Sequence, residues 1–335
     1  MDDTPNVSRV FDALTAYQRT AALQAALELD LFTSIGTAGA TAGELAERTG
    51  AAPRGVRSLC DRLVVDGFLA KDGDRYTLRA DAAAFLDRGS PAFIGSAVTF
   101  LTSPPVAGAF ARLTYAVRRG GTAVEDDGSL APEHPMWVEF ARAMAPLAGL
   151  TAQLLANVLA PLGPIRGSVL DVAAGHGLFG ITLAQQHAEA RVVAQDWPNV
   201  LAVAAENAAR AGVGDRFATL PGSAFDVDFG RDHALVLLTN FLHHFDPSTN
   251  ERLLARVHAA LAPGGRAVAV EFVPDESRVV PPEAAAFSLT MLATTPAGDA
   301  YTLREYEDVF RAAGFAGVSL ADLTPAPQRA LIATR

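Results

Sequence analysis

Two adjacent histidines stand out because they directly follow a short apolar run. His243 and His244 lie in the stretch LLTNFLHHFDP, and the chain has only seven histidines among its 335 residues. Histidine titrates near neutral pH and binds metals as a neutral ring, so the pair could move a proton, hold a metal or fill a structural role. Glu271 ends a later apolar run, AVAVE, where an acid could orient a histidine base.

A glycine-containing turn offers a second chemical site. The stretch VLDVAAGHGLFG places Asp171 on an apolar run, with Gly175 and Gly177 in the turn that follows. Glycines let a ligand approach the backbone, and GHGLFG is similar to a dinucleotide fingerprint. Asp196, in QDW, ends the next apolar run and is placed to accept hydrogen bonds from ribose hydroxyls. Because Asp171 precedes the glycines, a cationic, amino-acid-bearing ligand such as S-adenosylmethionine fits better than a pyrophosphate.

The elements that must position these residues alternate after residue 163. Apolar runs such as GSVLDVAA, ARVVAQDW, HALVLLTNFL and GRAVAVEFV are separated by helical segments such as NVLAVAAENAARAGV and STNERLLARVHAALA. Near-continuous apolar strands between helices predict a parallel sheet covered on both faces. The fold class is therefore α/β and doubly wound, with ligands at the carboxyl ends of the strands. All the residues singled out above fall at such ends.

The N-terminal region has the pattern of a winged helix. An Ala- and Leu-rich helix is expected over residues 12–31, and a short one follows Thr41, where Glu44 completes a capping box. The next helix carries apolar residues on one face and ends at Gly67. FLAKDGDRYTL then reads as two short strands joined by a turn at Gly73. Helix, turn, helix and hairpin follow in that order.

A winged helix can bind DNA, and Arg54, Arg57 and Arg62 favour that interpretation. Nearby aspartates offset these arginines, and 37 acidic against 27 basic residues give a net charge of −10. This charge opposes binding to nucleic acid or to an anionic membrane. The alternative is that the adjoining Ala- and Leu-rich surface forms a dimer interface. We expect no nucleic-acid partner.

Composition also bears on location. A single cysteine, Cys60, excludes an intrachain disulfide and favours a reducing compartment. The opening MDDTPNVSRV lacks the basic-then-apolar order of a signal peptide. We expect no apolar run close to the roughly 20 residues that span a bilayer, and hence a cytoplasmic protein without membrane contact.

The motifs DVAAGHG, QDWPNV, LPGSAF, FLHHFD, LAPGGRAVAVEFVP and FRAAGF follow in an order that resembles the S-adenosylmethionine-dependent O-methyltransferases. That family includes plant caffeate-type and bacterial polyketide enzymes, and its members carry an N-terminal winged-helix dimerisation domain. The resemblance implies a homodimer with S-adenosylmethionine as cofactor. It implies a dimerisation domain over 1–90, a helical connector over 91–163 that contributes to the substrate pocket, and a Rossmann-like class I methyltransferase domain over 164–335.

The resemblance also implies roles for individual residues. His243 corresponds to the family's general base and Glu271 to an acid that orients it. The family's second flanking acid corresponds to Ala300, and the neighbouring Asp299 is a candidate substitute. The expected cofactor-binding residues are Asp171, Ala173, Gly175, Gly177, Asp196, Trp197 as adenine-stacking partner, Ser223 in place of an acid, Ala224, Phe225 and Asn240.

A hydrophobic acceptor pocket is expected on both sides of the base. Phe140 and Met144 are four residues apart and share a helix face, which is typical of core but also of a pocket lining. The resemblance implies that the substrate-binding residues are Phe140, Met144, His244, Phe287 and Met291. An aromatic lining favours a flat acceptor such as a phenol or a polyketide-derived ring.

Three functions remain open from the sequence. The first is O-methylation of a small natural-product hydroxyl, and the second is C-methylation of an activated carbon beside a 2-oxo acid, with or without a metal. The third is a winged-helix regulator that senses S-adenosylmethionine. Consecutive residues at a strand end usually point to opposite sides, so His243 and His244 are poorly suited to chelate one ion. We therefore expect no metal.

Overall fold

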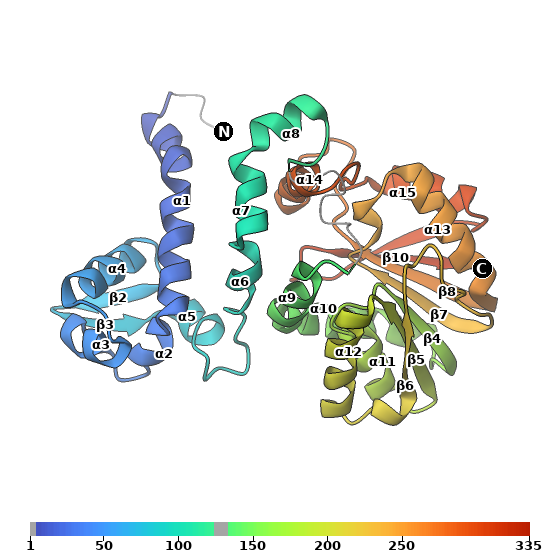
Figure 1. Cartoon of the computed structure of the whole chain (residues 1–335), viewed down its shortest axis with the longest axis horizontal. Helices are drawn as coiled ribbons and strands as arrows, with labels where there is room; N and C mark the ends of the chain where they lie inside the picture. The colour runs from blue at the N-terminus through green and yellow to red at the C-terminus, as the bar shows by residue number, and fades with distance from the viewer. Residues whose placement is uncertain (1–4, 124–132) are drawn as a thin grey trace. The chain divides into compact units, whose positions relative to one another are not determined.

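The computed structural model describes residues 5–123 and 133–335 of the chain. Its contacts divide the chain into two compact units, residues 1–103 and residues 104–335 (Figure 1). Each unit is described by itself below.

The N-terminal unit is mostly helical. Its elements are α1 (Val7–Glu28), α2 (Leu31–Ile35), β1 (Ala40–Thr41), α3 (Ala42–Thr49), α4 (Pro53–Val65), β2 (Leu69–Asp72), β3 (Arg75–Leu78), α5 (Ala80–Phe85) and α6 (Ala97–Leu101). The three strands form an antiparallel sheet in the order β1-β3-β2. The predicted capping box is confirmed, because Thr41 and Glu44 exchange side-chain and backbone hydrogen bonds. The helix–turn–helix–hairpin order is also confirmed.

Two of the three arginines of helix α4, Arg57 and Arg62, form ion pairs. The Arg57 guanidinium lies 3.3 Å from Asp61, and the Arg62 guanidinium lies 2.8 Å from Asp66, each one helical turn away. Asp61 also accepts a hydrogen bond from Lys71 on β2. These partners neutralise the positive charge that a DNA backbone would need.

The C-terminal unit begins with helices that precede its sheet. They are α7 (Pro104–Ala111), α8 (Leu113–Arg119), α9 (Met136–Ala143), α10 (Ala145–Leu159) and the 3-10 turn η2 (Ala160–Leu162). The expectation that no apolar run approaches membrane-spanning length was wrong. The 18 residues Ala145–Leu162 carry no charge, and by length and composition alone they could cross a membrane. One face of α10, with Leu155 and Leu159, is buried against the sheet, which is also typical of a core helix.

Seven strands form the sheet of this unit in the order β6-β5-β4-β7-β8-β10-β9. The strands are β4 (Gly167–Val172), β5 (Ala190–Asp196), β6 (Phe217–Pro221), β7 (His233–Thr239), β8 (Leu261–Glu271), β9 (Val318–Asp322) and β10 (Arg329–Thr334). Strands β6, β5, β4, β7 and β8 are parallel; the parallel arrangement of β4, β5, β7 and β8 was predicted, whereas β6 was not expected. Strand β10 is antiparallel to both β8 and β9, so one edge of the sheet is formed by two further strands that the alternating pattern did not predict.

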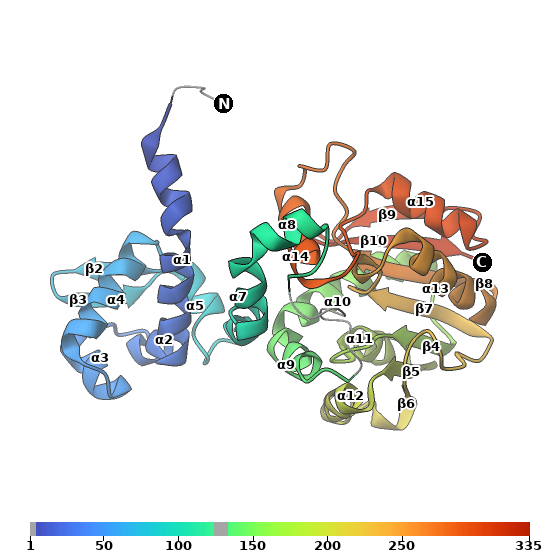
Figure 2. The ribbon, with the colours of Figure 1, turned by 45° about the horizontal axis from the view of Figure 1, so that its top comes forward.

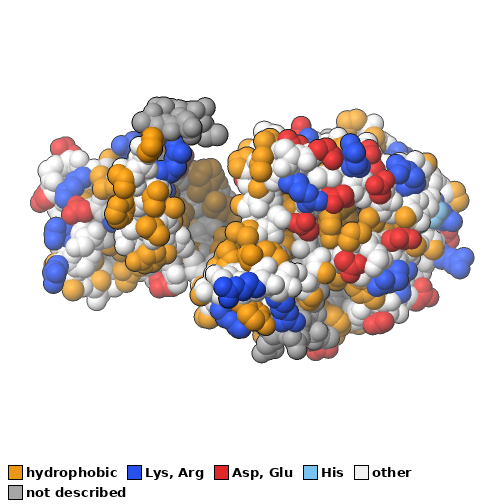
Figure 3. Space-filling model, turned by 90° about the horizontal axis from the view of Figure 1, so that it is seen from above, with side chains coloured by type: hydrophobic (Ala, Val, Ile, Leu, Met, Phe, Trp, Pro, Cys, Tyr) orange, Lys and Arg blue, Asp and Glu red, His pale blue; other side chains and the backbone are white. Residues whose placement is uncertain are grey.

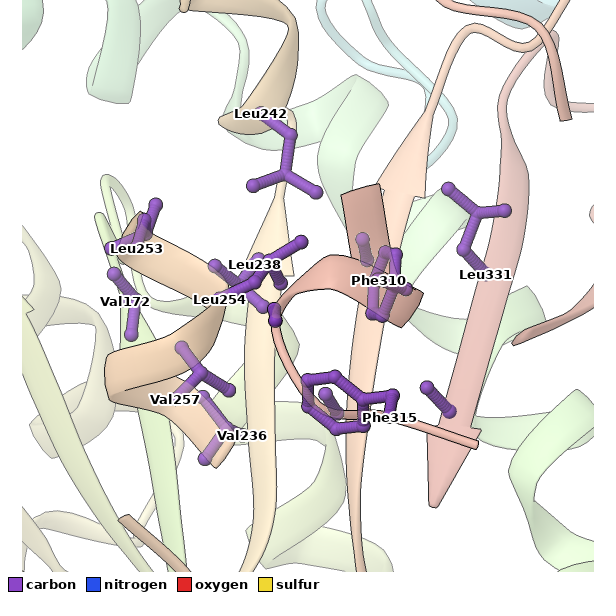
Figure 4. Close-up of a cluster of buried hydrophobic side chains, with 14 of the residues drawn as sticks. Val172, Val236, Leu238, Leu242, Leu253, Leu254, Val257, Phe310, Phe315 and Leu331 are labelled. Carbon is purple, nitrogen blue, oxygen red and sulfur yellow. The ribbon is translucent and has the colours of Figure 1, made fainter. Parts of the chain in front are cut away.

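Helices cover both faces of this sheet (Figures 1 and 2). Besides α10, they are α11 (Leu178–Gln186), α12 (Pro198–Arg210), α13 (Pro247–Ala260) and α15 (Leu303–Ala312). The same part of the chain contains α14 (Pro282–Thr294), which packs against α7 and α8, and the 3-10 turns η3 (Gly214–Arg216) and η4 (Leu242–His244). On β4, Leu170 packs with α13 and α15, while Val169 packs with α10 and α11. Figure 4 shows the first of these cores, where Phe310 lies among aliphatic side chains from β7, β10 and α13. This alternation follows from the two-residue period of a strand.

Candidate active site

The carboxyl ends of β4, β5, β7 and β8 bring the predicted site residues to one edge of the sheet. Strand register aligns Thr239 at the end of β7 with Val270, one residue before Glu271 on β8. Asn240 follows β7 with a left-handed φ of 53°, and its N–H donates to the Val270 carbonyl over 2.8 Å. The chain then turns into η4, which carries both histidines.

His243 and Glu271 form a buried pair. The Nδ1 atom of His243 lies 2.5 Å from one carboxylate oxygen of Glu271, whose side chain is fully buried. The other oxygen accepts the N–H groups of Phe241 and Leu242 over 3.0 and 2.8 Å. Because a carboxylate only accepts, Nδ1 carries the proton and Nε2 keeps its lone pair. The predicted contact is confirmed, and the proposed roles of the two residues stay predictions.

The carbonyl groups of the turn that holds His243 accept hydrogen bonds from neighbouring side chains. The side-chain amide of Asn250 donates to the carbonyls of Leu242 and Phe245 over 2.8 and 3.2 Å. The hydroxyl of Tyr301 also donates to Phe245, over 2.6 Å. These bonds leave the turn little freedom, so the position of His243 is set by packing as well as by Glu271.

Asp299 does not replace the acid missing at Ala300. Its carboxylate accepts hydrogen bonds from Ser288, from Arg278 over 3.2 Å and from the N–H of Ala300 over 2.8 Å. Its own N–H donates to the carbonyl of His243 over 3.0 Å, so it reaches the histidine through the main chain. The carboxylate is thus committed to other partners.

The expectation that the two histidines point to opposite sides was wrong. Their ring centroids lie 4.4 Å apart at an angle of 51°. The alternation of a strand does not apply, because both residues lie in the 3-10 turn η4, beyond the end of β7. Among the residues that the structure describes, no group of three or more His, Cys, Asp or Glu side chains is arranged to hold a metal.

His244 is 9% exposed and has aromatic neighbours. Its ring meets that of Trp137 edge-on at 5.5 Å, and Phe241 and Phe245 lie within 6.4 Å. Burial, and then the charge of His243, lower the pKa of His244 well below its usual value. The imidazole is therefore neutral at neutral pH.

The two imidazoles belong to a row of five rings. From Trp137 the row runs through His244 and His243 to Phe287, which meets His243 edge-on at 4.6 Å. It ends at Phe272, stacked on Phe287 at 3.9 Å. Sequence reasoning missed Trp137 and Phe272, although Phe272 directly follows Glu271 and Trp137 lies three residues before Phe140, on the same helix face. These two positions in the sequence could have indicated that both rings lie near the site.

The other expected acceptor-binding residues lie on the helices that supply this row. Phe140 meets Trp137 edge-on at 5.7 Å, and Met144 lies at the junction of α9 and α10. Met291, on α14 one turn after Phe287, is buried. Helices α9 and α14 thus supply aromatic rings on the two sides of the histidine pair, Trp137 against His244 and Phe287 against His243.

The turn after β4 is open at its backbone. Gly175 has a φ of +57°, and a Cβ there would meet only one atom, the carbonyl oxygen of Ala173 at 4.0 Å. Gly177 has a φ of +73°, and a Cβ there would press on Ala204 at 3.0 Å, so glycine is required for helix packing. Ala173 adopts a left-handed φ of 52° without being glycine. The turn thus contains three left-handed residues, of which Ala173 is not glycine.

Asp196 closes the same turn from β5. Its two oxygens accept the N–H groups of Gly175 and Trp197 over 2.8 and 2.7 Å. Burial raises the pKa of Asp196 to about 6. Its carboxylate thus borders the open backbone of Gly175, where a ribose would need an acceptor.

Asp171 lies below the turn and is fully buried. One oxygen accepts the N–H of Gly180 over 3.2 Å, and the other is enclosed without a hydrogen-bond partner. Burial raises the pKa of Asp171 to about 8. An orphaned carboxylate oxygen, an open left-handed glycine and the Asp196 carboxylate fit a cationic cofactor that carries a ribose.

The remaining expected cofactor residues surround that turn. Trp197 precedes α12 and packs against Val200, Val203 and Ala141. The Ser223 hydroxyl accepts the N–H of Phe225 over 3.1 Å, and Ala224 between them is buried. Ser223, Ala224 and Phe225 follow the end of β6, next to β5.

Comparisons with known proteins agree with this geometry. Residues 130–316 match the family model of the O-methyltransferase domain, and residues 11–88 match that of the O-methyltransferase dimerisation domain. The chain is 32% identical to the 3-hydroxy-5-methyl-1-naphthoate 3-O-methyltransferase of Streptomyces sahachiroi, over 90% of this chain and 88% of that protein. It is 30% identical to the tetracenomycin polyketide synthesis 8-O-methyl transferase of Streptomyces glaucescens, over 90% and 89%.

Solved structures give the same result. A crystal structure from Nostoc punctiforme, described as that of a candidate O-methyltransferase, is 47% identical, with a TM-score of 0.96 over 99% of this chain and 100% of that chain. Human N-acetylserotonin methyltransferase, solved with S-adenosylmethionine, has a TM-score of 0.85 at 21% identity, over 100% and 99%. The second likeness concerns the fold alone.

Proposed function

Because the chain belongs to the O-methyltransferase family, whose cofactor is S-adenosylmethionine, we propose that it methylates a hydroxyl of a small aromatic acceptor with His243 as general base. The single observation that carries the role of His243 is its buried contact with Glu271, which leaves Nε2 with a free lone pair. The two Streptomyces relatives are named for a naphthoate and a polyketide product, which supports an acceptor of the natural-product type.

The proposed chemistry needs little more than position and one proton transfer. S-adenosylmethionine, when bound, supplies a methyl group on a positively charged sulfur. The Nε2 atom of His243 takes the proton of the acceptor hydroxyl as the oxygen becomes nucleophilic. Glu271 holds the ring in the required tautomer and stabilises the imidazolium that results. The surrounding rings exclude water and orient a flat acceptor.

We assign cofactor binding to the turn after β4 and its neighbours. Asp196 accepts hydrogen bonds from the ribose hydroxyls, and Trp197 stacks on the adenine. Ser223 accepts a hydrogen bond near the adenine amino group, more weakly than the acid it replaces. Asp171 supports the turn from below by accepting the N–H of Gly180. Main chain near the ligand comes from Ala173, Gly175, Gly177, Ala224, Phe225 and Asn240.

We assign acceptor binding to the rows of side chains on α9 and α14. Phe140, Met144, Phe287 and Met291 line the pocket, and His244 closes it beside the base. This assignment keeps the division into a dimerisation domain (1–90), a connector that contributes to the pocket (91–163) and a catalytic domain (164–335).

We also propose a homodimer formed through the N-terminal unit, in the cytoplasm, without nucleic-acid or membrane partners. A dimerisation-domain match and exposed apolar residues on α1 support the dimer. The single cysteine and the net charge of −10 support the location and the absence of polyanion partners.

The test is the variant His243→Ala. General-base catalysis contributes about 10²- to 10⁴-fold, so kcat for a hydroxylated aromatic should fall by that factor. The dissociation constant of S-adenosylmethionine, measured by calorimetric titration, should stay within a few-fold. Glu271→Gln, which keeps the shape of the side chain but removes its charge, should also lower kcat. Turnover by His243→Ala at the wild-type rate would refute the assignment of the base.

A further inference from the structure

The second imidazole of the pair has unused hydrogen-bonding capacity. His244 is buried, with 9% of its surface exposed, and its Nδ1 atom is enclosed without any hydrogen-bond partner. Its Nε2 atom is not enclosed in this way, and it makes no hydrogen bond with any residue that the structure describes. Of the two ring nitrogens, Nε2 is therefore the one that reaches accessible space.

The surroundings of His244 decide which nitrogen carries the proton. Burial keeps the ring neutral by lowering its pKa. Trp137, Phe241 and Phe245 pack around it and offer Nδ1 no acceptor. A buried N–H without a partner is rarer in proteins than an unpaired acceptor, so Nδ1 is bare and Nε2 is protonated. His244 is thus a hydrogen-bond donor toward accessible space.

The two neighbouring rings then have complementary roles. His243 presents a lone pair at Nε2 because Glu271 holds the proton of Nδ1, whereas His244 presents an N–H. Their centroids are only 4.4 Å apart. Two oxygens on neighbouring carbons of a flat ring match this arrangement: one is a hydroxyl that gives up its proton, and the other accepts a hydrogen bond.

We propose, building on the proposed function, that His244 selects acceptors in which the methylated hydroxyl has a second oxygen ortho or peri to it. A carbonyl, an ether or a hydroxyl can serve, because each accepts from Nε2–H. An acceptor without this oxygen leaves the donor unpaired once the ring excludes water. Such unpaired donors are the strongest basis of specificity in buried sites.

The test uses a pair of probes with the same shape. They are 3-methoxy-2-naphthol, which carries the second oxygen, and 3-ethyl-2-naphthol, in which a methylene replaces it. The naphthol ring follows the naphthoate relative. For the wild-type protein we expect kcat/KM to be at least about tenfold higher for the methoxy probe. The dissociation constants of both probes are measured with S-adenosylhomocysteine present.

Two variants isolate the hydrogen bond. His244→Phe keeps an aromatic ring but has no donor, so the ratio between the probes should fall to within about twofold. His244→Asn keeps an N–H donor, so its ratio should exceed that of His244→Phe. General damage to the fold cancels, because each ratio compares two probes on one variant.

Three outcomes overturn the inference. They are equal use of both probes by the wild type, a ratio unchanged in His244→Phe, and failure of the methoxy probe to bind or react. Equal methylation of both probes leaves the proposed function standing, since methyl transfer to a hydroxyl has then been observed. The proposed function fails only if His243→Ala is as active as the wild type or if no hydroxylated aromatic is methylated.

Discussion

At the scale of residues, one carboxylate contacts both the ring of the candidate base and the main chain of the turn that carries it. Glu271 orients the ring of His243 with one oxygen and holds the main chain of Phe241 and Leu242 with the other. The loss of the family's second acid at Ala300 therefore leaves the ring with a single carboxylate whose position is itself strongly fixed. A fully buried carboxylate with three hydrogen bonds meets the usual requirement for buried charge.

Asp171 leads to a prediction of pH-dependent stability. Its pKa is about 8 in the folded protein, against 3.8 as the ordinary value. The folded state thus holds a proton that the unfolded state has lost, and the stability so gained is complete below about pH 4 and disappears as the pH rises through about 8.

The variant Asp171→Asn should remove this dependence, because an amide stays neutral and can still accept from Gly180. Between pH 6 and 9 the cofactor-free wild type should lose on the order of 2 kcal/mol more stability than the variant. Melting temperatures across this range measure the difference. Parallel curves for the two proteins would contradict the assignment of a protonated Asp171.

At the scale of elements, the segment between α14 and α15 packs directly on the turn of the histidines. The N–H of Asp299 and the hydroxyl of Tyr301 bond to the carbonyls of His243 and Phe245. A Cβ at Gly298 would press into the His243 carbonyl oxygen and lie 2.6 Å from Thr295 Oγ1 and 3.0 Å from the His244 carbonyl carbon. The main chain at position 298 lies so close to the main chain of the histidine turn that only glycine fits there.

We therefore expect Gly298→Ala to displace η4 and the base. A shift of about 1 Å in a catalytic group can cost about 100-fold, so kcat should fall by that order while cofactor affinity stays within a few-fold. Gly317→Ala is the matched control, since a Cβ there meets nothing within 4 Å. Steady-state kinetics with isothermal titration of S-adenosylmethionine measure both quantities. Equal loss in the two variants would argue against the packing explanation.

At the scale of the whole molecule, α1 presents an apolar stripe. Its exposed large side chains are Val7, Val10, Phe11, Leu14 and Tyr17, each 58–69% exposed. They recur at helical spacing and so share one face. Figure 3 shows hydrophobic side chains gathered on one face of the N-terminal unit. Such a patch is typical of an interface, in agreement with the dimerisation-domain match.

The variant Phe11→Asp should convert the dimer into monomer, because it buries a charge in an apolar contact. Ala16→Asp adds the same charge on the opposite face of α1 and should leave the dimer intact. Light scattering after size-exclusion chromatography measures the mass of each variant. A dimer that persists in Phe11→Asp would show that the interface lies elsewhere.

Local pattern determined much of this protein. Apolar runs of strand length predicted β4, β5, β7 and β8, and the capping signals predicted α3. Since parallel strands end at one edge, the pattern also placed His243 beside Glu271, which lie 28 positions apart. The family resemblance added the cofactor and the dimerisation domain, both of which the comparisons show. These features depend on short stretches and on the geometry of a sheet, which sequence spacing encodes.

Tertiary packing decided the rest. The 3-10 turn placed the rings of His243 and His244 side by side, whereas strand alternation would have separated them. Trp137 and Phe272 join the same row from positions far apart in the chain, and Asp299 reaches His243 through its main chain while its carboxylate bonds to other groups. Such contacts depend on how helices and loops close over the sheet edge. Outside the regular geometry of the sheet, spacing along the chain does not fix the distances between helices and loops that pack only after folding.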